Sequence, residues 1–320
     1  MKTTNLREAY GQALVEFGAL DQRIVVLEAD LGNSTRTCLF KAKFPHRYFE
    51  MGIAEQNMAS TAAGLALVGK MPFINSFAVF AAGRAYDQIR NVICIPKLPV
   101  RICGSSSGLS DFADGKTHQA VEDAAIMRAI PNMTVLVPVD AVETRAMVLA
   151  LLDYPGPVYM RLNRNDLPIY TPEDNGYQIG LMPTIREGQD IVVFANGIMV
   201  SRAMAAAEAL EAEHISVKVV NVSTMKPLDR DAILGHLAPS TRGVIVAEEH
   251  TLVGGLLGAI LESVQGSLGV PIKAIGIKDS FGTSAASYDE LLAHYGLTNT
   301  AIANAARSLS NGASDSHRHS

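Results

Sequence analysis

The sequence contains few cysteines, and their arrangement excludes two kinds of scaffold. Cys38, Cys94 and Cys103 are the only three in 320 residues. Their odd number argues against a disulfide framework, and none of their spacings is that of a zinc site. We therefore expect neither cross-links nor a structural metal.

Positive charge is also scarce, and long apolar runs are missing. The chain has 27 Lys and Arg against 32 Asp and Glu, a net charge of −5, and no basic stripe. This balance disfavours nucleic-acid binding. No stretch approaches about 18 uninterrupted apolar residues, and residues 1–8 lack the apolar core of a signal peptide. We expect a cytoplasmic protein with no nucleic-acid or membrane partner.

Hydrophobic residues make up 48% of the chain, and its length allows two domains with separate cores. Short β-branched runs predict buried strands, at 23–28, 47–50, 71–74, 100–103, 134–138 and 158–162, and then at 191–195, 217–220, 243–247 and 272–277. Helical patterns lie between them, at 5–20, 54–68, 80–93, 119–129, 140–152, 201–213, 228–237 and 254–264. This alternation predicts an α/β fold with two parallel or mostly parallel sheets, each with helices on both faces.

The domain boundary is predicted from a change of composition. Residues 171–189 are rich in Pro, Gly, Asp and Glu and have no sustained apolar period, as is typical of a linker. We expect a first domain at 1–172, a linker at 173–189 and a second domain at 190–309. Residues 310–320 are small and polar without a period, which predicts a disordered tail.

A glycine-marked turn, Met51-Gly52-Ile53-Ala54-Glu55-Gln56-Asn57, places Glu55 at the start of an apolar helical run. A lone glutamate there has an ordinary explanation, because negative charge is favoured at a helix N-terminus. Two stretches follow it: an aromatic-rich turn over residues 73–84 and the loop Asp114-Gly115-Lys116-Thr117-His118-Gln119. Apolar pairs spaced like Phe77 and Phe80 usually belong to a core, and a lone loop histidine is usually solvated, so each stretch alone says little.

Together the three stretches resemble the pyrimidine-binding domain of transketolase-type thiamine diphosphate enzymes, and the resemblance continues over residues 4–308 into the family's C-terminal domain. In that family a different domain, with a Gly-Asp-Gly motif and a following Asn, holds the coenzyme's diphosphate and Mg²⁺. This chain contains no Gly-Asp-Gly. The resemblance therefore implies half of an active site, without metal ligands. It implies an N-terminal, diphosphate-binding transketolase subunit as partner, holding Mg²⁺ (or Ca²⁺ or Mn²⁺) in an α2β2 assembly.

The resemblance also implies which residues contact the thiamine diphosphate. Glu55 matches the catalytic glutamate that hydrogen-bonds the aminopyrimidine ring, so that the coenzyme's own exocyclic nitrogen can remove the thiazolium proton. A dry pocket would favour this sharing of a proton. Phe77 and Phe80 match aromatic walls around the pyrimidine, with Ile74 at the third aromatic position. Asp30 and Ile53 are also expected beside the coenzyme.

Substrate contacts follow from the same resemblance. His118 matches a catalytic histidine that hydrogen-bonds the substrate carbonyl or alkoxide, and Asp114 matches an aspartate that reads the neighbouring hydroxyl. Ser34 and Arg164 match contacts to a sugar phosphate, for which a planar guanidinium is well suited.

Two further phosphate contacts of the family are replaced in this sequence. An arginine position falls on Thr4, and a histidine position falls on Ser106, which we count among the substrate-binding residues. Arg7, Arg36, Lys116 or the partner must supply the missing donors. We therefore predict that the anionic end of the substrate is held differently from that in an ordinary pentose-phosphate transketolase.

The implied activity is transfer of a two-carbon ketol unit from a ketose donor to an aldose acceptor, by the C-terminal subunit of a split transketolase acting on small sugars. One rival is the β subunit of a 2-oxo acid dehydrogenase E1, which shares both domain types. Another is a deoxyxylulose-phosphate-synthase-like enzyme, whose diphosphate-binding domain lies in the same chain. A purely structural subunit is the alternative without catalysis.

The His118 loop and Arg164 favour a sugar enzyme among these rivals. Glu248-Glu249-His250 invites a metal site, but we interpret it as a structural turn before Gly254-Gly255.

Overall fold

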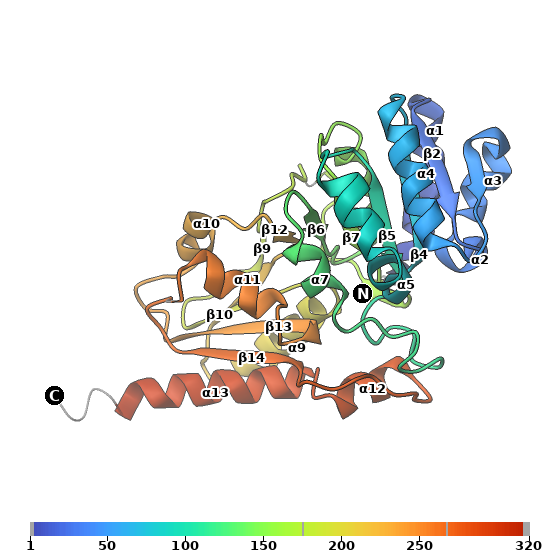
Figure 1. Ribbon diagram of the computed structural model, residues 1–320. Coiled ribbons are helices and arrows are strands. Elements are labelled where there is room, and N and C mark those ends of the chain that lie inside the picture. Colours follow the sequence, from blue (N-terminus) through green and yellow to red (C-terminus); the bar gives the residue numbers. More distant parts are fainter. Residues whose placement is uncertain (1–2, 175, 267, 316–320) are drawn as a thin grey trace.

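The computed structural model describes residues 3–174, 176–266 and 268–315. It has two α/β units: the blue to green part of Figure 1 and the yellow to red part. Each unit is built around its own sheet, and a two-stranded antiparallel sheet of β1 (Thr3–Asn5) and β8 (Asp166–Pro168) ties the start of the chain to the end of the first unit.

The first unit has a seven-stranded sheet in the order β12-β6-β7-β5-β4-β2-β3. Its strands are β2 (Ile24–Glu28), β3 (Tyr48–Glu50), β4 (Met71–Phe77), β5 (Arg101–Ser105), β6 (Thr134–Leu136), β7 (Val158–Arg161) and β12 (Thr224–Lys226). All neighbours are parallel except β12, which runs antiparallel to β6. The predicted parallel sheet is therefore confirmed.

Both faces of this sheet are covered because the strand residues alternate. Ile24 and Val26 of β2 pack into a cluster with α1 (Leu6–Leu20) and α8 (Ala141–Ala150), whereas Val25 and Leu27 pack with the helices of the other face. Those helices are α4 (Glu55–Leu67), α5 (Ala78–Gly83) and α7 (Asp123–Ala129), with a π-helix at Ile89–Cys94. Short helices α2 (Gly32–Thr35), α3 (Cys38–Lys43) and α6 (Tyr86–Gln88) and a 3₁₀ turn (Pro45–Arg47) complete the unit.

The second unit has a five-stranded sheet in the order β14-β13-β10-β11-β9. Its strands are β9 (Thr184–Arg186), β10 (Ile191–Ala195), β11 (Val217–Asn221), β13 (Gly243–Thr251) and β14 (Ile272–Ile277). The helices are α9 (Ile198–Glu211), α10 (Arg230–Gly235), α11 (Leu256–Ser263), α12 (Tyr288–His294) and α13 (Asn299–Asp315). All strand pairs are parallel except β9 with β11.

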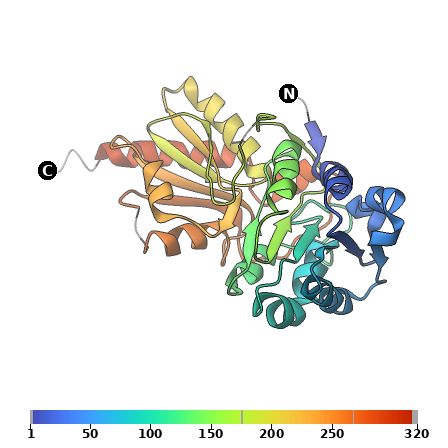
Figure 2. The ribbon, with the colours of Figure 1, turned by 90° about the horizontal axis from the view of Figure 1, so that it is seen from above.

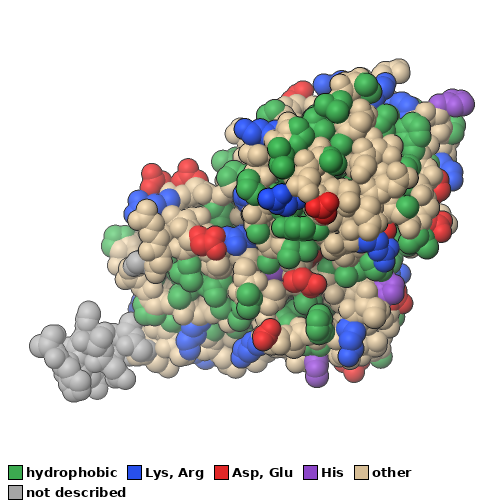
Figure 3. Space-filling model, in the orientation of Figure 1, with side chains coloured by type: hydrophobic (Ala, Val, Ile, Leu, Met, Phe, Trp, Pro, Cys, Tyr) green, Lys and Arg blue, Asp and Glu red, His purple; other side chains and the backbone are tan. Residues whose placement is uncertain are grey.

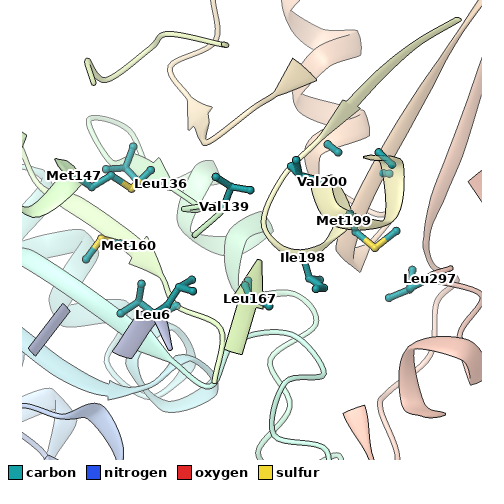
Figure 4. Close-up of a cluster of buried hydrophobic side chains, with 14 of the residues drawn as sticks. Leu6, Leu136, Val139, Met147, Met160, Leu167, Ile198, Met199, Val200 and Leu297 are labelled. Atoms are coloured by element: carbon teal, nitrogen blue, oxygen red, sulfur yellow. The ribbon is translucent and has the colours of Figure 1, made fainter. Parts of the chain in front are cut away.

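The two units are packed tightly against each other. Strand β12 follows β11 in the second unit but completes the sheet of the first. One hydrophobic cluster also includes side chains of both, among them Leu136 and Leu167 on one side and Ile198 and Met199 on the other (Figure 4). Figure 2 shows the two sheets side by side from above.

The structure corrects several details of the sequence prediction. Strand β9 lies inside the predicted linker 173–189, so this segment also forms the edge of the second sheet. Helix α13 runs to Asp315, so residues 310–315 are helical where a disordered tail was predicted, and 316–320 lie outside the described residues. The predicted helix at 119–129 begins only at Asp123. Helices α12 and α13 were not predicted.

Two further findings concern the helices and the surface charge. Within the described ranges, no helix combines the length and apolar character needed to cross a membrane. On the face shown in Figure 3, acidic and basic side chains are interspersed, without a continuous basic stripe.

Candidate active site

Glu55 is the first residue of α4, and it is almost completely buried, with 1% of its surface exposed. The turn before it contains Gly52 at φ +68°, a conformation that favours glycine. Two donors reach the carboxylate: the Ser76 hydroxyl donates to Oε1 at 3.1 Å, and Arg84 Nη1 donates to Oε2 at 2.8 Å. The fold thus holds a buried carboxylate at the start of a helix, paired with one guanidinium and one hydroxyl.

Two aromatic rings and an imidazole gather at the junction of β4 and α5. Phe77 and Phe80 are stacked with an interplanar angle of 20° and centroids 6.3 Å apart. His118 meets both rings edge-on, at 6.2 Å from Phe77 and 5.5 Å from Phe80. Ile74, which lies in β4 together with Phe77, is also buried. The structure therefore brings the predicted loop histidine to the predicted aromatic pair, although 38 residues separate His118 from Phe80.

Arg164 lies beside this group and is surrounded by charge. Its guanidinium is 6.0 Å from the centroid of Phe77, it forms an ion pair with the buried Asp111, and Nη1 is 4.0 Å from an Asp114 oxygen. Burial raises the pKa of Asp111, and the nearby Arg164 opposes that shift. Arg164 is therefore held in place by one carboxylate and lies within reach of the exposed Asp114.

Arg7 brings a second guanidinium to the same region. Its Nη1 donates to the Ser34 carbonyl oxygen at 2.8 Å, and its Nε is buried without a partner among the residues that the structure describes. Burial, followed by the like charges of Arg164 and Arg36, lowers the pKa of Arg7 to about 10. The positive charges of Arg7, Arg164 and Arg36 repel one another, and such a cluster of positive charge attracts an anion. Of the donors considered from sequence, Arg7 is the one that this geometry favours, whereas Lys116 is exposed on its loop.

The other four predicted positions differ in their environment, from complete burial to exposure at the surface. Thr4 is in β1, paired with Leu167. Asp30 has a positive φ of 62° and, with Ser34, lines a surface cavity of about 270 Å³. Ile53 is 74% exposed, and Ser106 is fully buried with a hydroxyl that lacks a partner in the described part of the chain. A substrate could reach Ser106 only if its loop moved, because no oxygen of that side chain is open to solvent.

The Glu248-Glu249-His250 segment is a junction between the two units. Glu248 accepts hydrogen bonds from the first amides of α11, those of Leu256 and Leu257, at 2.6 and 3.1 Å. His250 Nδ1 donates to the Thr251 carbonyl, and burial lowers the pKa of His250 to about 4, so the ring is neutral. These bonds give the segment a structural role, but it forms the end of β13, and the predicted turn lies just after it, at residues 252–255.

Glu249 forms the link between the units. It accepts from the Leu109 amide at 2.7 Å and from Asn163 Nδ2 at 3.2 Å, both in the first unit, while Asn163 also donates to the Tyr288 hydroxyl at 2.7 Å. Arg161, paired with the buried Asp123, donates to the Glu249 carbonyl at 3.0 Å. Burial raises the pKa of Glu249 to about 7.

Sequence reasoning missed Arg84 and Asp111. A signal for Arg84 existed, because it follows Phe80 by four residues, and side chains at that spacing on a helix are neighbours; its guanidinium carbon lies 4.5 Å from the Phe80 centroid. Asp111 had no signal, since only the fold brings it to Arg164. Within residues 3–174, 176–266 and 268–315, no group of three His, Cys, Asp or Glu could hold a metal ion.

Comparison with known proteins agrees with the class that fold and site define, an α/β subunit with a buried carboxylate near an aromatic pair. Residues 2–169 match the model of the transketolase pyrimidine binding domain, and residues 180–302 match that of the transketolase C-terminal domain. The chain belongs to the transketolase family.

Three relatives are similar along nearly their whole length. A putative transketolase C-terminal section of Methanocaldococcus jannaschii is 42% identical, with 93% of this chain and 94% of the relative covered. A 6-deoxy-6-sulfo-D-fructose transketolase subunit of Clostridium sp. is 39% identical, with 95% and 94% covered. A solved structure described as a split gene transketolase, inactive beta4 tetramer, is 44% identical with a TM-score of 0.87, covering 97% of this chain and 99% of the other.

Proposed function

We propose that this chain is the C-terminal subunit of a split transketolase and transfers a two-carbon ketol unit from a ketose to an aldose together with a separate diphosphate-binding subunit. The observation that carries this proposal is the buried Glu55 at the start of α4, in a chain that also brings Phe77, Phe80 and His118 together. A purely structural subunit would not need this carboxylate, the aromatic pair and the imidazole together.

The residues present fit the pyrimidine half of thiamine diphosphate. Glu55 offers a dry carboxylate for a ring nitrogen, and Phe77 and Phe80 offer apolar ring faces for packing. When bound, the coenzyme supplies the nucleophilic carbon that carries the ketol unit. We assign Mg²⁺ and the diphosphate to the partner, because the described residues of this chain contain no metal-binding group and the sequence has no Gly-Asp-Gly.

The chain's own residues then have distinct roles. Glu55 shares a proton with the pyrimidine nitrogen, and the burial that excludes water strengthens this bond. His118, half-buried with Nδ1 2.9 Å from the Thr117 hydroxyl, holds a proton for the substrate oxygen that develops charge. Asp114 is exposed on the same loop and reads a neighbouring hydroxyl. Asp30 and Ile53 complete the coenzyme contacts only at the interface with the partner, because both are exposed here.

We further propose that the substrate ends in an anion bound by Arg164 and Arg7, with Ser34 beside them. Arg164 is already compensated by Asp111, so the net positive charge available is smaller than two guanidiniums suggest. A relative is named for a 6-sulfo sugar, and a sulfonate carries less charge than a phosphate. We therefore include sulfonated sugars with sugar phosphates as candidate substrates.

We propose an α2β2 assembly in the cytoplasm. The relative described as an inactive beta4 tetramer is consistent with a C-terminal subunit that associates with itself when its partner is missing. Exposed apolar side chains around Ile53, Leu67 and Val68 provide surface for such association.

The test is reconstitution with the diphosphate-binding subunit. The mixture, with Mg²⁺ and thiamine diphosphate, is assayed for ketol transfer between xylulose 5-phosphate or a 6-sulfo ketose and an aldose phosphate. We expect activity only when both chains are present. Decarboxylation of a 2-oxo acid without ketol transfer would favour the dehydrogenase rival, and condensation of pyruvate with glyceraldehyde 3-phosphate would favour the deoxyxylulose-phosphate-synthase-like rival.

A further inference from the structure

The loop that follows β5, residues 110–119, packs against the second unit and carries two of the proposed substrate contacts. We call it the substrate loop. Residues 281–286, between β14 and α12, face it and are named the backing segment. The two lie side by side next to α12 (Figure 1), and the Ala285 amide donates a hydrogen bond to the Phe112 carbonyl at 3.0 Å. The second unit therefore contacts the substrate loop directly.

The backing segment is held at both of its ends. The Tyr295 hydroxyl donates to the Phe281 carbonyl at 2.8 Å, and the Ala286 amide donates to Glu290 Oε2 at 3.1 Å. Glu290 lies in the first turn of α12, and its own amide donates to the Ser287 hydroxyl at 3.2 Å. This reciprocal capping fixes the chain where it enters the helix. The backing segment is therefore a firm support for the substrate loop.

Gln119 joins the substrate loop to this support. Its side chain is 2% exposed, and its Nε2 donates to the Asp111 carbonyl at 3.1 Å and to the Thr283 carbonyl at 2.9 Å. Asp111 is near the start of the loop, and Thr283 belongs to the backing segment. A side-chain amide carries two N–H donors, and this one uses both. One buried side chain thus ties the two ends of the loop to each other and to the second unit.

Gln119 also lies between the two groups proposed to bind different ends of the sugar. His118 is its neighbour in the chain, and the side chain of Asp111 pairs with Arg164. The His118 ring centroid and the Arg164 guanidinium carbon lie 6.2 and 6.0 Å from the Phe77 centroid. His118 is assigned to the reacting oxygen and Arg164 to the anion. The bonds of Gln119 therefore determine how these two contacts are spaced.

We propose that Gln119 is a positioning residue: its bonds hold His118 and Arg164 at one spacing, and so select sugars by the distance between carbonyl and anion. The inference rests on the proposed function. A loop that is not held adopts the binding-competent arrangement for only part of the time, and the apparent affinity for the sugar falls by that fraction. Gln119 acts through the loop, because its own side chain is buried.

Two variants disturb Gln119 from opposite sides. Gln119→Met keeps the length of the side chain and removes both donors. Gly282→Ala acts from the second unit, because a Cβ there would overlap Gln119 Oε1 and the amide would have to move. The backbone of Gly282 is outside the left-handed region, so alanine adds no strain of its own. The second variant keeps the proposal testable if the first does not fold.

The kinetic test uses the reconstituted two-subunit complex, with xylulose 5-phosphate or a 6-sulfo ketose as donor, whichever the wild type prefers. We expect KM for the donor to rise about tenfold in both variants, with a smaller change in kcat, as for a loop that is competent about a tenth of the time. Coenzyme affinity should stay within about twofold of the wild type, because Gln119 donates to no group assigned to the coenzyme. A role in stability alone would lower the amount of active complex without raising KM.

The spacing is tested with two donors of different length. Xylulose 5-phosphate and fructose 6-phosphate differ by one carbon between carbonyl and phosphate. A loosened loop tolerates both lengths, so the ratio of their kcat/KM values should move toward one in both variants. A ratio that is unchanged, or already near one in the wild type, overturns selection by spacing.

Hydrogen exchange in the full chain gives a second readout that needs no coenzyme. Amides of residues 110–119 and 281–286 should exchange faster in both variants, because the contacts that protect them are weakened. Gln22→Met, at an exposed glutamine, is the matched control for the first variant. Gly235→Ala, at the end of α10 where an added Cβ would have nothing within 4 Å, is the control for the second. Both controls should behave like the wild type in every test.

The possible results have different meanings. Faster exchange together with a raised KM and normal coenzyme affinity supports the proposal. An unchanged KM in both variants overturns it, with or without a fall in kcat, and so does a raised KM that is accompanied by loss of coenzyme binding. A wild-type complex without ketol transfer refutes the proposed function instead, and the exchange rates then still decide whether Gln119 holds the loop.

Discussion

Glu249, at the junction between the two units, should contribute a stabilisation that is lost as the pH rises. Burial, the largest effect, raises the pKa of Glu249 to about 7 from an ordinary 4.5. The folded state thus binds a proton more tightly than the unfolded state. The stabilisation is complete below pH 4.5 and is lost as the pH rises to about 7.

The size of this effect follows from the shift. At about 1.36 kcal/mol per pKa unit, the change is about 3 kcal/mol for this one carboxylate. Glu28, Glu143 and Glu248 are also buried, and the pKa of each is raised to about 7, so they add to the same trend. Carboxylates with a lowered pKa, such as Asp21 beside Arg23, act in the opposite direction. Only a comparison between variants isolates one group.

Glu249→Gln removes the titration and keeps the size of the side chain. The free energy of unfolding is measured by urea denaturation at several pH values between 4.5 and 7.5. We expect the decrease over this range to be smaller in the variant by about 3 kcal/mol. The control is Glu187→Gln, at a side chain that is 81% exposed, which should leave the slope unchanged. Equal slopes for Glu249→Gln and the wild type would show that this carboxylate does not hold a proton in the junction.

Two further predictions concern binding. Arg164→Ala should raise KM for anionic sugars about tenfold or more with a smaller effect on kcat, because a charge-assisted bond contributes about 1.5–3 kcal/mol. Arg7→Ala should raise KM as well, whereas Lys116→Ala, at an exposed side chain, should not. The measurement is steady-state kinetics with phosphorylated, sulfonated and neutral sugars, and an Arg164→Ala variant with unchanged KM for all of them would contradict the prediction. The isolated chain should bind thiamine diphosphate at least a hundredfold more weakly than the two-subunit complex, because it lacks diphosphate and metal contacts; equal affinity in calorimetry with Mg²⁺ would contradict the split site.

The fold class could be predicted from the sequence, because a buried strand is recognised from a short run of consecutive residues. Ile24 to Glu28 and Ile191 to Ala195 are β-branched, buried runs, and the structure has them as interior strands. Helix α13 was missed although Ile302, Ala306 and Leu309 recur at helical spacing and are buried. The polar residues between these three positions make the helical spacing of the apolar residues hard to recognise in the sequence. Strand β12 could not be predicted, because its partner β6 lies about ninety residues earlier, and short strands carry little signal of their own.

The site was predicted in part for a similar reason. Glu55, Phe77, Phe80 and His118 belong to short motifs, whose spacing within each segment is visible in the sequence. Their meeting point depends on tertiary structure, as do the ion pairs Glu55–Arg84 and Arg164–Asp111. The exposure of Ile53 and the burial of Ser106 likewise depend on loop packing, which no local pattern encodes. The roles assigned to these residues stay predictions until variants are measured.

In the proposed function, Glu55 activates a coenzyme that is shared with a second subunit. The most direct measurement is the ketol-transfer kcat of Glu55→Gln in the reconstituted complex, with folding checked by circular dichroism and Glu187→Gln as control. Glutamine has nearly the same shape but cannot share the proton, so we expect kcat to fall at least a hundredfold. A variant that kept more than about a tenth of the wild-type kcat, less than about 1.4 kcal/mol of barrier, would contradict the account.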